Sequence, residues 1–298
     1  MKELKTLSGI IIPQIGLGTY PLQGEELATT VQHALEIGYR LIDTSDDYRG
    51  EVGIGIGCKK SFANGCLKRE DIFLQTKISA NNSFPDEPLA GLFFNPDSPF
   101  MKRHSVAEIV RDKVEESLFN MKTDYIDSLL IHLPYPYYYE EIWDTMLIMQ
   151  KEGKIRYIGV SNFHPHHIEN CIKRGGKPSI NEIYLSPICI KNEQIVYAYE
   201  NNIQVMTYSP LIDVAHGKIN ELYFIKYIQK YQKSLAQIIL RWNIDRGCLP
   251  LPKTKNINRL KENFDVFDFS LTKDEINEIS MLNIDSQYLP ESKICPGL

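Results

Sequence analysis

The stretch Arg40-Leu-Ile-Asp-Thr-Ser-Asp-Asp-Tyr48 carries the features around which the rest of the chain can be interpreted. It begins with apolar Leu41 and Ile42, which are typical of a short buried strand. It ends in a polar turn that holds a carboxylate, Asp43, and a phenol, Tyr48. A phenol has an unperturbed pKa of about 10, so Tyr48 becomes a useful proton donor only where nearby positive charge stabilises its phenolate. The rest of the chain should therefore supply a cation beside Tyr48 and a group for Tyr48 to protonate.

This strand is one of eight apolar runs, each of which precedes a helical pattern. The runs are residues 15–20, 40–45, 72–78, 125–133, 155–162, 179–186, 203–211 and 248–254. Helical patterns follow at 25–38, 51–62, 106–121, 139–153, from 165, 192–202, 221–231, 234–247, 256–264 and from 272. Such alternation predicts a parallel sheet covered by helices, and eight units favour a single α/β domain over residues 1–298, a closed (β/α)8 TIM barrel. Ser8-Gly9, between two apolar runs, predicts an N-terminal β-hairpin.

The alternative is an open sheet that binds a dinucleotide, and it needs a Gly-x-Gly-x-x-Gly turn after the first strand. The near match, Gly53-Ile-Gly-Ile-Gly57, has the wrong spacing and lies inside a predicted helix. We interpret it as close helix packing or as a frayed helix, and the barrel remains the prediction.

Charge and composition exclude several classes of partner. The net charge of −5 does not favour nucleic acid or an anionic membrane as a binding partner. No apolar run resembles a signal peptide or approaches the roughly 18 residues of a membrane span. The six cysteines show no Cys-x-x-Cys pair and no metal-ligand spacing, and His164, His166 and His167 are expected to be solvent-exposed at a helix start. We therefore expect a cytoplasmic protein with reduced thiols, without a metal site, and monomeric because no exposed heptad demands a partner.

Polar side chains stand where the predicted strands end, which is where barrels carry their chemistry. In order, the strand ends are Thr19-Tyr20, Asp43 with Tyr48, Lys77, His132, Ser161-Asn162, Asn181-Glu182, Tyr208-Ser209 and Lys253-Thr254. A barrel without a site would not need polar groups at every position of its rim.

Six motifs, in order and at matching spacing, resemble the aldo-keto reductase superfamily from Leu17 to about Ser280. They are LIDTSDDY (41–48), TKI (76–78), LIHLP (130–134), IRYIGVSNF (155–163), YSPL (208–211) and LPKTKNINRLKENF (251–264). The resemblance implies an oxidoreductase that uses NAD(P)H to reduce the carbonyl group of a small molecule.

The resemblance assigns a role to each member of a catalytic tetrad. Hydride delivered to a carbonyl carbon leaves negative charge on the oxygen, which must then be hydrogen-bonded and protonated. By resemblance Tyr48 is the acid, Lys77 lowers its pKa, Asp43 holds Lys77, and His132 donates to the substrate oxygen. Singly, each residue has an ordinary explanation, namely a loop tyrosine, a turn cap, a solvent-facing lysine and a core histidine. Their joint occurrence at matching strand ends favours the site.

The resemblance also implies an NADPH site. Ser161 and Asn162 match the positions that hold the nicotinamide carboxamide, and Tyr208 matches the aromatic residue that stacks on the ring. A basic group matches the positions that bind an adenosine 2′-phosphate, which favours NADPH over NADH because Lys and Arg form charge-assisted bonds with phosphate. This group is Lys253, Thr254 and Arg259. The other implied cofactor contacts are Gly18, Thr19, Tyr20, Glu182, Ser209, Leu211, Glu262 and Asn263.

Glu182 departs from the family pattern, which has glutamine after Asn181. An ionised glutamate accepts hydrogen bonds but cannot donate them, and its charge would favour the positively charged oxidised nicotinamide. Glu182 could therefore favour NADP⁺ binding and alcohol oxidation. The alternative is a protonated or rotated side chain with no redox consequence.

A long segment over residues 79–104 shows no obvious secondary structure. Loops of this length are usually functional or disordered, and its four phenylalanines favour a packed lid over the active-site mouth. The aromatic run Tyr135-Pro-Tyr-Tyr-Tyr139 lies at the same rim. Together they predict a substrate with an apolar or aromatic body, unless the two clusters simply pack on each other. Because the C-terminal tail is short, the lid could also close the pocket as longer tails do in relatives.

Two other functions remain open at this point. A module that binds NADP(H) and regulates a partner would show little turnover, although it would not need the whole tetrad. A lyase or isomerase that merely shares the barrel would not bind NADPH.

Overall fold

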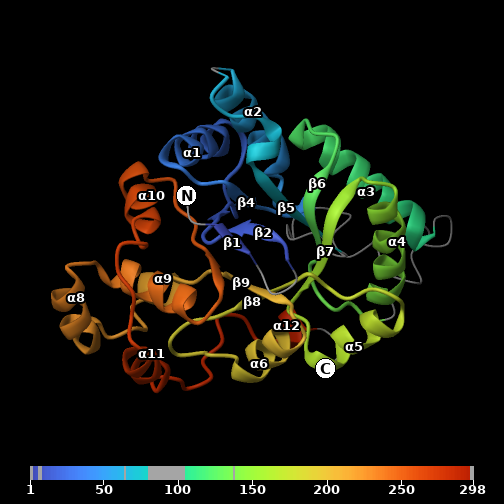
Figure 1. The fold of residues 1–298 in the computed structure, drawn as a ribbon. Helices are drawn as coiled ribbons and strands as arrows, with labels where there is room; N and C mark the ends of the chain where they lie inside the picture. The colour runs from blue at the N-terminus through green and yellow to red at the C-terminus, as the bar shows by residue number, and fades with distance from the viewer. Residues whose placement is uncertain (1–2, 6–8, 64, 80–104, 137, 296–298) are drawn as a thin grey trace.

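The computed structural model describes residues 3–5, 9–63, 65–79, 105–136 and 138–295. Within these residues eight parallel strands pair in chain order (Figure 1). They are β3 (Leu17–Gly18), β4 (Leu41–Asp43), β5 (Phe73–Ile78), β6 (Ile126–Ile131), β7 (Ile155–Ser161), β8 (Ile180–Tyr184), β9 (Gln204–Tyr208) and β10 (Leu249–Leu251). The amides of Gly16 and Gly18 donate to the carbonyl oxygens of Pro250 and Pro252, both at 3.1 Å, and join the first strand to the last. The predicted (β/α)8 TIM barrel is confirmed.

Helices surround the strands on the outside of the barrel (Figure 1). The longer ones are α1 (Gly24–Ile37), α2 (Glu51–Phe62), α3 (Val106–Met121), α4 (Tyr139–Lys151), α5 (Pro165–Lys173), α6 (Asn192–Glu200), α8 (Ile225–Tyr231), α9 (Leu235–Asp245), α10 (Ile257–Phe264) and α11 (Lys273–Ser280). Helix α3 begins with a capping box, in which the Ser105 hydroxyl accepts from the Glu108 amide at 3.2 Å. None of the described helices is long and apolar enough to cross a membrane.

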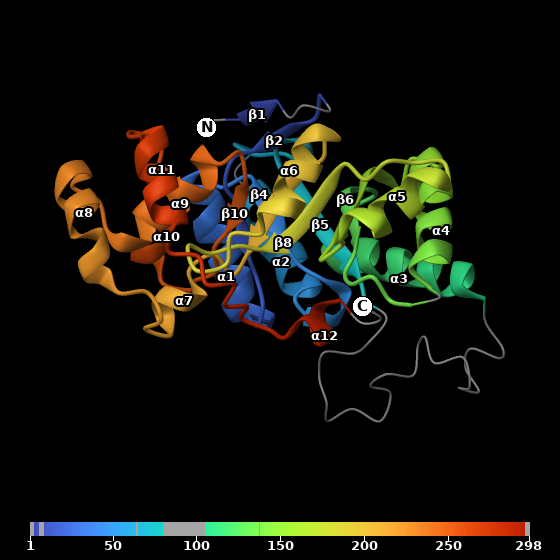
Figure 2. The same ribbon diagram turned by 90° about the horizontal axis from the view of Figure 1, so that it is seen from below.

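The predicted hairpin closes one end of the barrel. Strand β1 (Glu3–Lys5) pairs antiparallel with β2 (Ile11–Pro13). Ile12 is fully buried in an apolar cluster with Leu41 and Phe73, which begin their strands. Figure 2 shows the hairpin at one end of the molecule and the short helices α7 (Ile212–Ala215) and α12 (Glu291–Ile294) at the other. Because the hairpin covers the N-terminal ends of the strands, the polar strand ends lie at the opposite opening.

The glycines of helix α2 serve close packing. A Cβ atom on Gly55 would lie 2.5 Å from the carbonyl oxygen of Asn120 at the end of α3. One on Gly57 would lie 2.6 Å from the carbonyl oxygen of Ala28 in α1. Of the two interpretations of this glycine run, close helix packing is the one that the structure shows.

Several short elements escape the sequence pattern. Apart from the 3-10 helix η3 (Glu221–Phe224), which begins the helical run predicted at 221–231, they are α7, α12 and the 3-10 helices η1 (Asp46–Tyr48) and η2 (Arg69–Asp71). Each is too short to show a hydrophobic period. Two of them, η1 and α12, carry side chains that matter below. All six cysteines are free thiols, and Cys66 is the exposed one.

Candidate active site

Four side chains from neighbouring strand ends meet at the open end of the barrel. Asp43 is the last residue of β4, Lys77 lies near the end of β5, and His132 directly follows β6. Tyr48 closes the 3-10 helix η1, which follows β4. Because β5 pairs with both β4 and β6, these strand ends are neighbours. The structure thus brings together the four residues that the sequence analysis singled out.

Lys77 lies at the centre of a buried ion cluster. Its Nζ atom lies 2.6 Å from Asp43 Oδ1 and 3.3 Å from Glu182 Oε1, and it donates to the Thr44 carbonyl oxygen at 3.0 Å. Burial by itself would lower the pKa of Lys77, but Asp43 and Glu182 raise it above the usual value overall. The ammonium group therefore stays charged.

Gln75 completes this cluster. Its Nε2 atom donates to Asp43 Oδ1 at 2.9 Å and to Glu182 Oε2 at 2.8 Å, so the amide bridges the two carboxyl groups. The sequence analysis did not single out Gln75. Its position two residues before Lys77 on the same strand was the available signal, because residues two apart face the same side.

The net pKa of Tyr48 is raised rather than lowered in this arrangement. Burial raises the pKa of Tyr48 well above its usual value, and the charges of Asp43 and Glu182 raise it further. Lys77 Nζ lies 5.5 Å from the centre of the Tyr48 ring and donates hydrogen bonds to Asp43 and to the Thr44 carbonyl oxygen. The positive charge of Lys77 does not outweigh these effects, so Tyr48 is a protonated phenol at neutral pH. That Lys77 stabilises the phenolate stays a prediction.

His132 faces Tyr48 with one ring nitrogen and a serine pair with the other. The Tyr48 hydroxyl oxygen lies 3.2 Å from His132 Nε2, while Ser79 Oγ and Ser45 Oγ lie 2.5 Å and 3.2 Å from Nδ1. Burial lowers the pKa of His132 to about 4, against the opposing charge of Asp47. The ring is therefore neutral at pH 7. The tautomer with its one proton on Nε2, facing Tyr48, is the one in which a serine hydroxyl donates to Nδ1. Ser79 is a second residue that the sequence analysis did not assign to the site.

Glu182 points into the ion cluster from β8. Burial and the Asp43 charge together raise its pKa to about 8, although Lys77 opposes the shift. At neutral pH the side chain mainly keeps its proton and can donate as well as accept, as a glutamine does. Of the two interpretations of this departure, the protonated one applies at neutral pH and the ionised one only in alkaline solution.

Three of the residues expected at the nicotinamide contact one another beside His132. Asn162 Nδ2 donates to Ser161 Oγ at 3.0 Å, and the Tyr208 hydroxyl donates to Asn162 Oδ1 at 2.9 Å. Asn162 Nδ2 also lies 3.4 Å from the His132 carbonyl oxygen. Asn162 has a φ of 61°, in the left-handed region that asparagine tolerates. The end of β7 is thereby held against His132.

Two exposed cations lie at the start of α10. Lys253 and Arg259 are exposed, and neither forms an ion pair with any residue that the structure describes. Lys255, by contrast, pairs with Glu26 at 2.7 Å. The helix N-terminus adds partial positive charge at the same place. This combination suits an anionic group such as a phosphate.

The other expected cofactor residues lie along the same rim. Thr19 donates from Oγ1 to the Asp43 carbonyl oxygen at 2.8 Å, and the rings of Tyr20 and Tyr48 lie 4.9 Å apart. Gly18 ends β3, and Ser209 and Leu211 follow β9. Thr254 precedes α10, and Glu262 and Asn263 lie within that helix. Their contacts with a cofactor remain predictions.

Two tyrosines of the aromatic run at residues 135–139 belong to the apolar core. Tyr135 and Tyr139 are buried there, and Tyr139 packs edge-on against Phe163 at 5.3 Å. For these two residues packing is the structural role, and a substrate with an apolar or aromatic body stays a prediction. The predicted lid lies outside the described residues from position 80 to position 104.

Two of the three histidines at the start of α5 are less exposed than predicted. His166 is exposed, but His167 is buried and His164 is half-buried. His164 Nε2 lies 2.7 Å from Glu291 Oε1 in the tail helix α12. The sequence analysis singled out neither Glu291 nor its neighbour Cys295, because nothing local in the sequence shows that the tail returns to this rim.

Comparison with known proteins places this site in a family. The sequence profile of the Aldo/keto reductase family matches residues 14–284. The chain is 36% identical over 291 residues to the methylglyoxal reductase DkgA of Escherichia coli, with 97% of this chain and 96% of the relative covered. It is 33% identical over 291 residues to the glyoxal reductase of Bacillus subtilis, with 96% and 95% covered.

A solved structure agrees with these matches. The crystal structure of a Bombyx mori aldo-keto reductase in complex with NADP superposes with a TM-score of 0.83 at 30% identity, covering 98% of this chain and 96% of that one. The profile match, the identity over almost the whole length and the shared barrel agree, and the chain belongs to the aldo/keto reductase family.

Proposed function

We propose that this chain reduces a small aldehyde or ketone to the alcohol, with NADPH as the cofactor and Tyr48 as the proton donor. The observation that carries the proposal is the 3.2 Å contact between the Tyr48 hydroxyl and neutral His132, beside the buried Asp43–Lys77 pair. The family consists of oxidoreductases that act on carbonyl groups, and two relatives are named for methylglyoxal and glyoxal reduction. A small dicarbonyl compound is therefore the first substrate to test.

The residues of the site fit the protein's part in this reaction. Bound NADPH would supply the hydride. His132, with its proton on Nε2, can donate to the carbonyl oxygen and fix its orientation next to the Tyr48 hydroxyl. Tyr48 then gives its proton to the oxygen as negative charge develops there. The raised pKa of Tyr48 keeps this proton in place at neutral pH, and an alkoxide is still a strong enough base to take it.

The raised pKa of Tyr48 also favours one direction of reaction. Oxidation of an alcohol would need the phenolate as a base, and this form is scarce at neutral pH when the pKa lies above its usual value. Reduction needs the phenol, which is the form present. Carbonyl reduction is therefore the proposed direction, ahead of alcohol oxidation.

The groups that would hold NADP(H) fit its chemistry. Asn162 carries both an amide donor and an acceptor at the end of β7, as a carboxamide requires, and cofactor binding would exchange its present bonds to Ser161 and Tyr208. Lys253 and Arg259 are exposed cations without an ion-pair partner in the described residues, as a 2′-phosphate requires. The steady-state test is the oxidation of NADPH with methylglyoxal, glyoxal and bulkier ketones, and no turnover of any carbonyl compound would refute the proposal.

The preference for NADPH should depend on the two free cations. Removing both in the Lys253→Ala/Arg259→Ala variant should lower the NADPH-to-NADH ratio of kcat/KM by about 100-fold, because a hydrogen bond to a charged group contributes roughly 1.5–3 kcal/mol. Lys255→Ala is the matched control, since Lys255 is exposed on the same segment but is paired with Glu26. An unchanged ratio in the double variant would show that these residues do not bind a 2′-phosphate.

Glu182 should make the relative affinity for the two cofactor forms depend on pH. Above its pKa of about 8 the side chain gains a negative charge, which favours the positively charged ring of NADP⁺. We expect the affinity for NADP⁺ relative to NADPH to rise about tenfold as pH increases through this value. The reason is the Coulomb attraction between the Glu182 carboxylate and the positively charged ring. Separate fluorescence titrations with each form, at several pH values, measure the ratio.

The Glu182→Gln variant is the control for this effect, and its ratio should stay flat. Asp43, Lys77, Tyr48 and Tyr208 face Glu182 and are the same in both proteins, so their own titration cancels in the comparison. If the affinity ratio changed with pH in the same way in both proteins, Glu182 would be excluded as the source of the pH dependence.

A further inference from the structure

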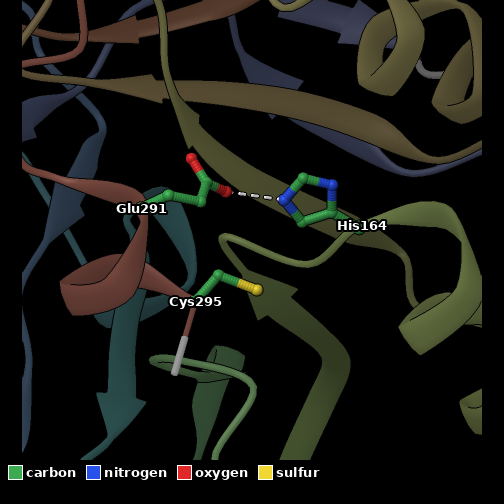
Figure 3. A group of neighbouring side chains, drawn as sticks. All are labelled: His164, Glu291 and Cys295. Atoms are coloured by element: carbon green, nitrogen blue, oxygen red, sulfur yellow. Dashed lines mark hydrogen bonds and ion pairs between the residues drawn. The ribbon is translucent and has the colours of Figure 1, made fainter. Parts of the chain in front are cut away.

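Three metal-binding side chains converge on the rim, outside the tetrad. His164 precedes α5, Glu291 begins the tail helix α12, and Cys295 directly follows that helix. One ligand atom from each residue lies within 4.8 Å of the other two. Figure 3 shows the imidazole, the carboxylate and the thiol pointing toward one another from these two separate segments.

From this geometry we propose that His164, Glu291 and Cys295 bind a zinc-class divalent cation that fastens the C-terminal tail to the end of β7. The ligand set decides the class of metal, because nitrogen, sulfur and oxygen donors together suit Zn²⁺ and similar cations, whereas Mg²⁺ and Ca²⁺ prefer oxygen alone. Three protein ligands would leave a fourth position for water.

The spacing of the ligand atoms is close to what such a cation requires. Bonds of about 2.0–2.3 Å in a tetrahedron place ligand atoms roughly 3.3–3.8 Å apart. His164 Nε2 and Glu291 Oε1 lie 2.7 Å apart in a hydrogen bond, and the other separations reach at most 4.8 Å. Shifts of about an ångström would replace this hydrogen bond by bonds from the imidazole, the carboxylate and the thiolate to the cation. The His164 Nε2 proton and the Cys295 thiol proton would both be released to solvent.

The carboxylate of Glu291 is already held in a suitable orientation. Its Oε2 atom accepts from Gln287 Nε2 at 2.5 Å and lies 3.4 Å from Lys191 Nζ, so that Oε1 is the atom facing His164. Supporting hydrogen bonds of this kind orient the ligands of natural metal sites. Gln287 Oε1 is also buried without a hydrogen-bond partner in the part of the chain that the structure describes. This amide oxygen is therefore available as a further metal ligand beside the cluster.

One of the three ligands, His164, borders a solvent-accessible cavity, whereas Cys295 is fully buried. A cavity of about 310 Å³ is lined by His164 and Lys191 and by two acidic residues, Glu193 and Asp285. It provides an entry path on the side of the imidazole. The positive charge of Lys191 opposes a cation, but it acts on the carboxylate oxygen that faces away from the site.

A cation here would act close to the cofactor residues. His164 lies two positions after Asn162 in the chain. From the tail, Tyr288 contacts Tyr184 at 6.4 Å between ring centres, and Tyr184 contacts Tyr208 at 6.0 Å. Binding would therefore restrain the tail at the edge of the proposed nicotinamide site.

The test is a titration of untagged, metal-free protein with Co²⁺, which substitutes for Zn²⁺ and gives a thiolate-to-metal charge-transfer band. We expect the band to saturate at one equivalent in the wild type and to be absent in Cys295→Ser. Cys66→Ser is the matched control and should keep the band, because Cys66 is the exposed thiol elsewhere on the surface. His164→Gln should lower the Co²⁺ affinity by at least about tenfold.

Thermal unfolding with Zn²⁺ supplies a second readout and checks that the variants are folded. Zn²⁺ should raise the melting temperature of the wild type and of Cys66→Ser, but not of Cys295→Ser. A wild type without the charge-transfer band, or a band that survives Cys295→Ser, would overturn the proposal. Neither measurement uses catalytic activity, so its outcome is independent of the proposed reductase function.

Discussion

Replacing Tyr48 with phenylalanine should lower kcat/KM for carbonyl reduction by about 10³-fold or more. The phenol is the group placed to protonate the substrate oxygen, and general acid catalysis contributes roughly 10²–10⁴-fold. The substitution also removes the hydrogen bond to His132 Nε2, so the histidine loses its orienting partner. Steady-state oxidation of NADPH with methylglyoxal measures the effect.

The same variant should bind NADPH with nearly unchanged affinity. Tyr48 is half-buried and the phenylalanine ring keeps its contact with Tyr20, so the fold and the cofactor site are preserved. Fluorescence titration with NADPH is the control. If Tyr48→Phe retained activity within a few fold of the wild type, another group would have to be the proton donor.

Replacing Lys77 with methionine should abolish activity and destabilise the fold. Lys77 is 1% exposed and neutralises Asp43, so its loss leaves a buried carboxylate uncompensated. Breaking a buried pair in this way costs about 3–5 kcal/mol of unfolding free energy. Activity should fall as well, because Lys77 is the cation that faces the phenol when Tyr48 gives up its proton. Chemical denaturation measures the free energy and NADPH oxidation the activity.

A double variant separates these two effects. In Lys77→Met/Asp43→Asn no unpaired charge remains between the two positions, so much of the lost stability should return. Activity should not return, since the phenolate would still form without a cation. Recovery of activity together with stability would show that Lys77 only supports the fold.

Much of the fold could be predicted because the barrel repeats one simple pattern. Most strands are buried on both faces and are mainly apolar, with Arg156 in β7 an exposed exception, and the helices follow their own period. The strand ends then follow from topology, which is why Asp43, Lys77 and His132 could be placed together before their distances were known. The short helices could not be predicted, because three or four residues show no period.

The electrostatics of the site could not be predicted from the motifs. The sequence shows a lysine and a tyrosine at neighbouring strand ends, but not that Asp43 neutralises the lysine and that Glu182 lies beside it. The sign of the shift in the pKa of Tyr48 depends on burial and on these carboxyl groups, and both are tertiary properties. The interior partners Gln75 and Ser79 were missed for the same reason.

The contact between the C-terminal tail and His164 could not be predicted either. Glu291 and Cys295 meet His164 across more than a hundred residues of sequence, as shown by the Glu291–His164 hydrogen bond with its separation of 127. No local spacing connects them, so a search for neighbouring metal ligands in the sequence finds nothing. Only the folded chain brings the three together.

The most direct test of the central claim is to follow the hydride itself. NADPH carrying deuterium at C4 of the nicotinamide, on the face from which the hydride is transferred, would be incubated with the wild-type protein and methylglyoxal. The claim predicts an alcohol product with one deuterium on the former carbonyl carbon, formed by the wild type and at least about 10²-fold more slowly by Tyr48→Phe. An alcohol without deuterium, or no product although NADPH binds, would contradict it.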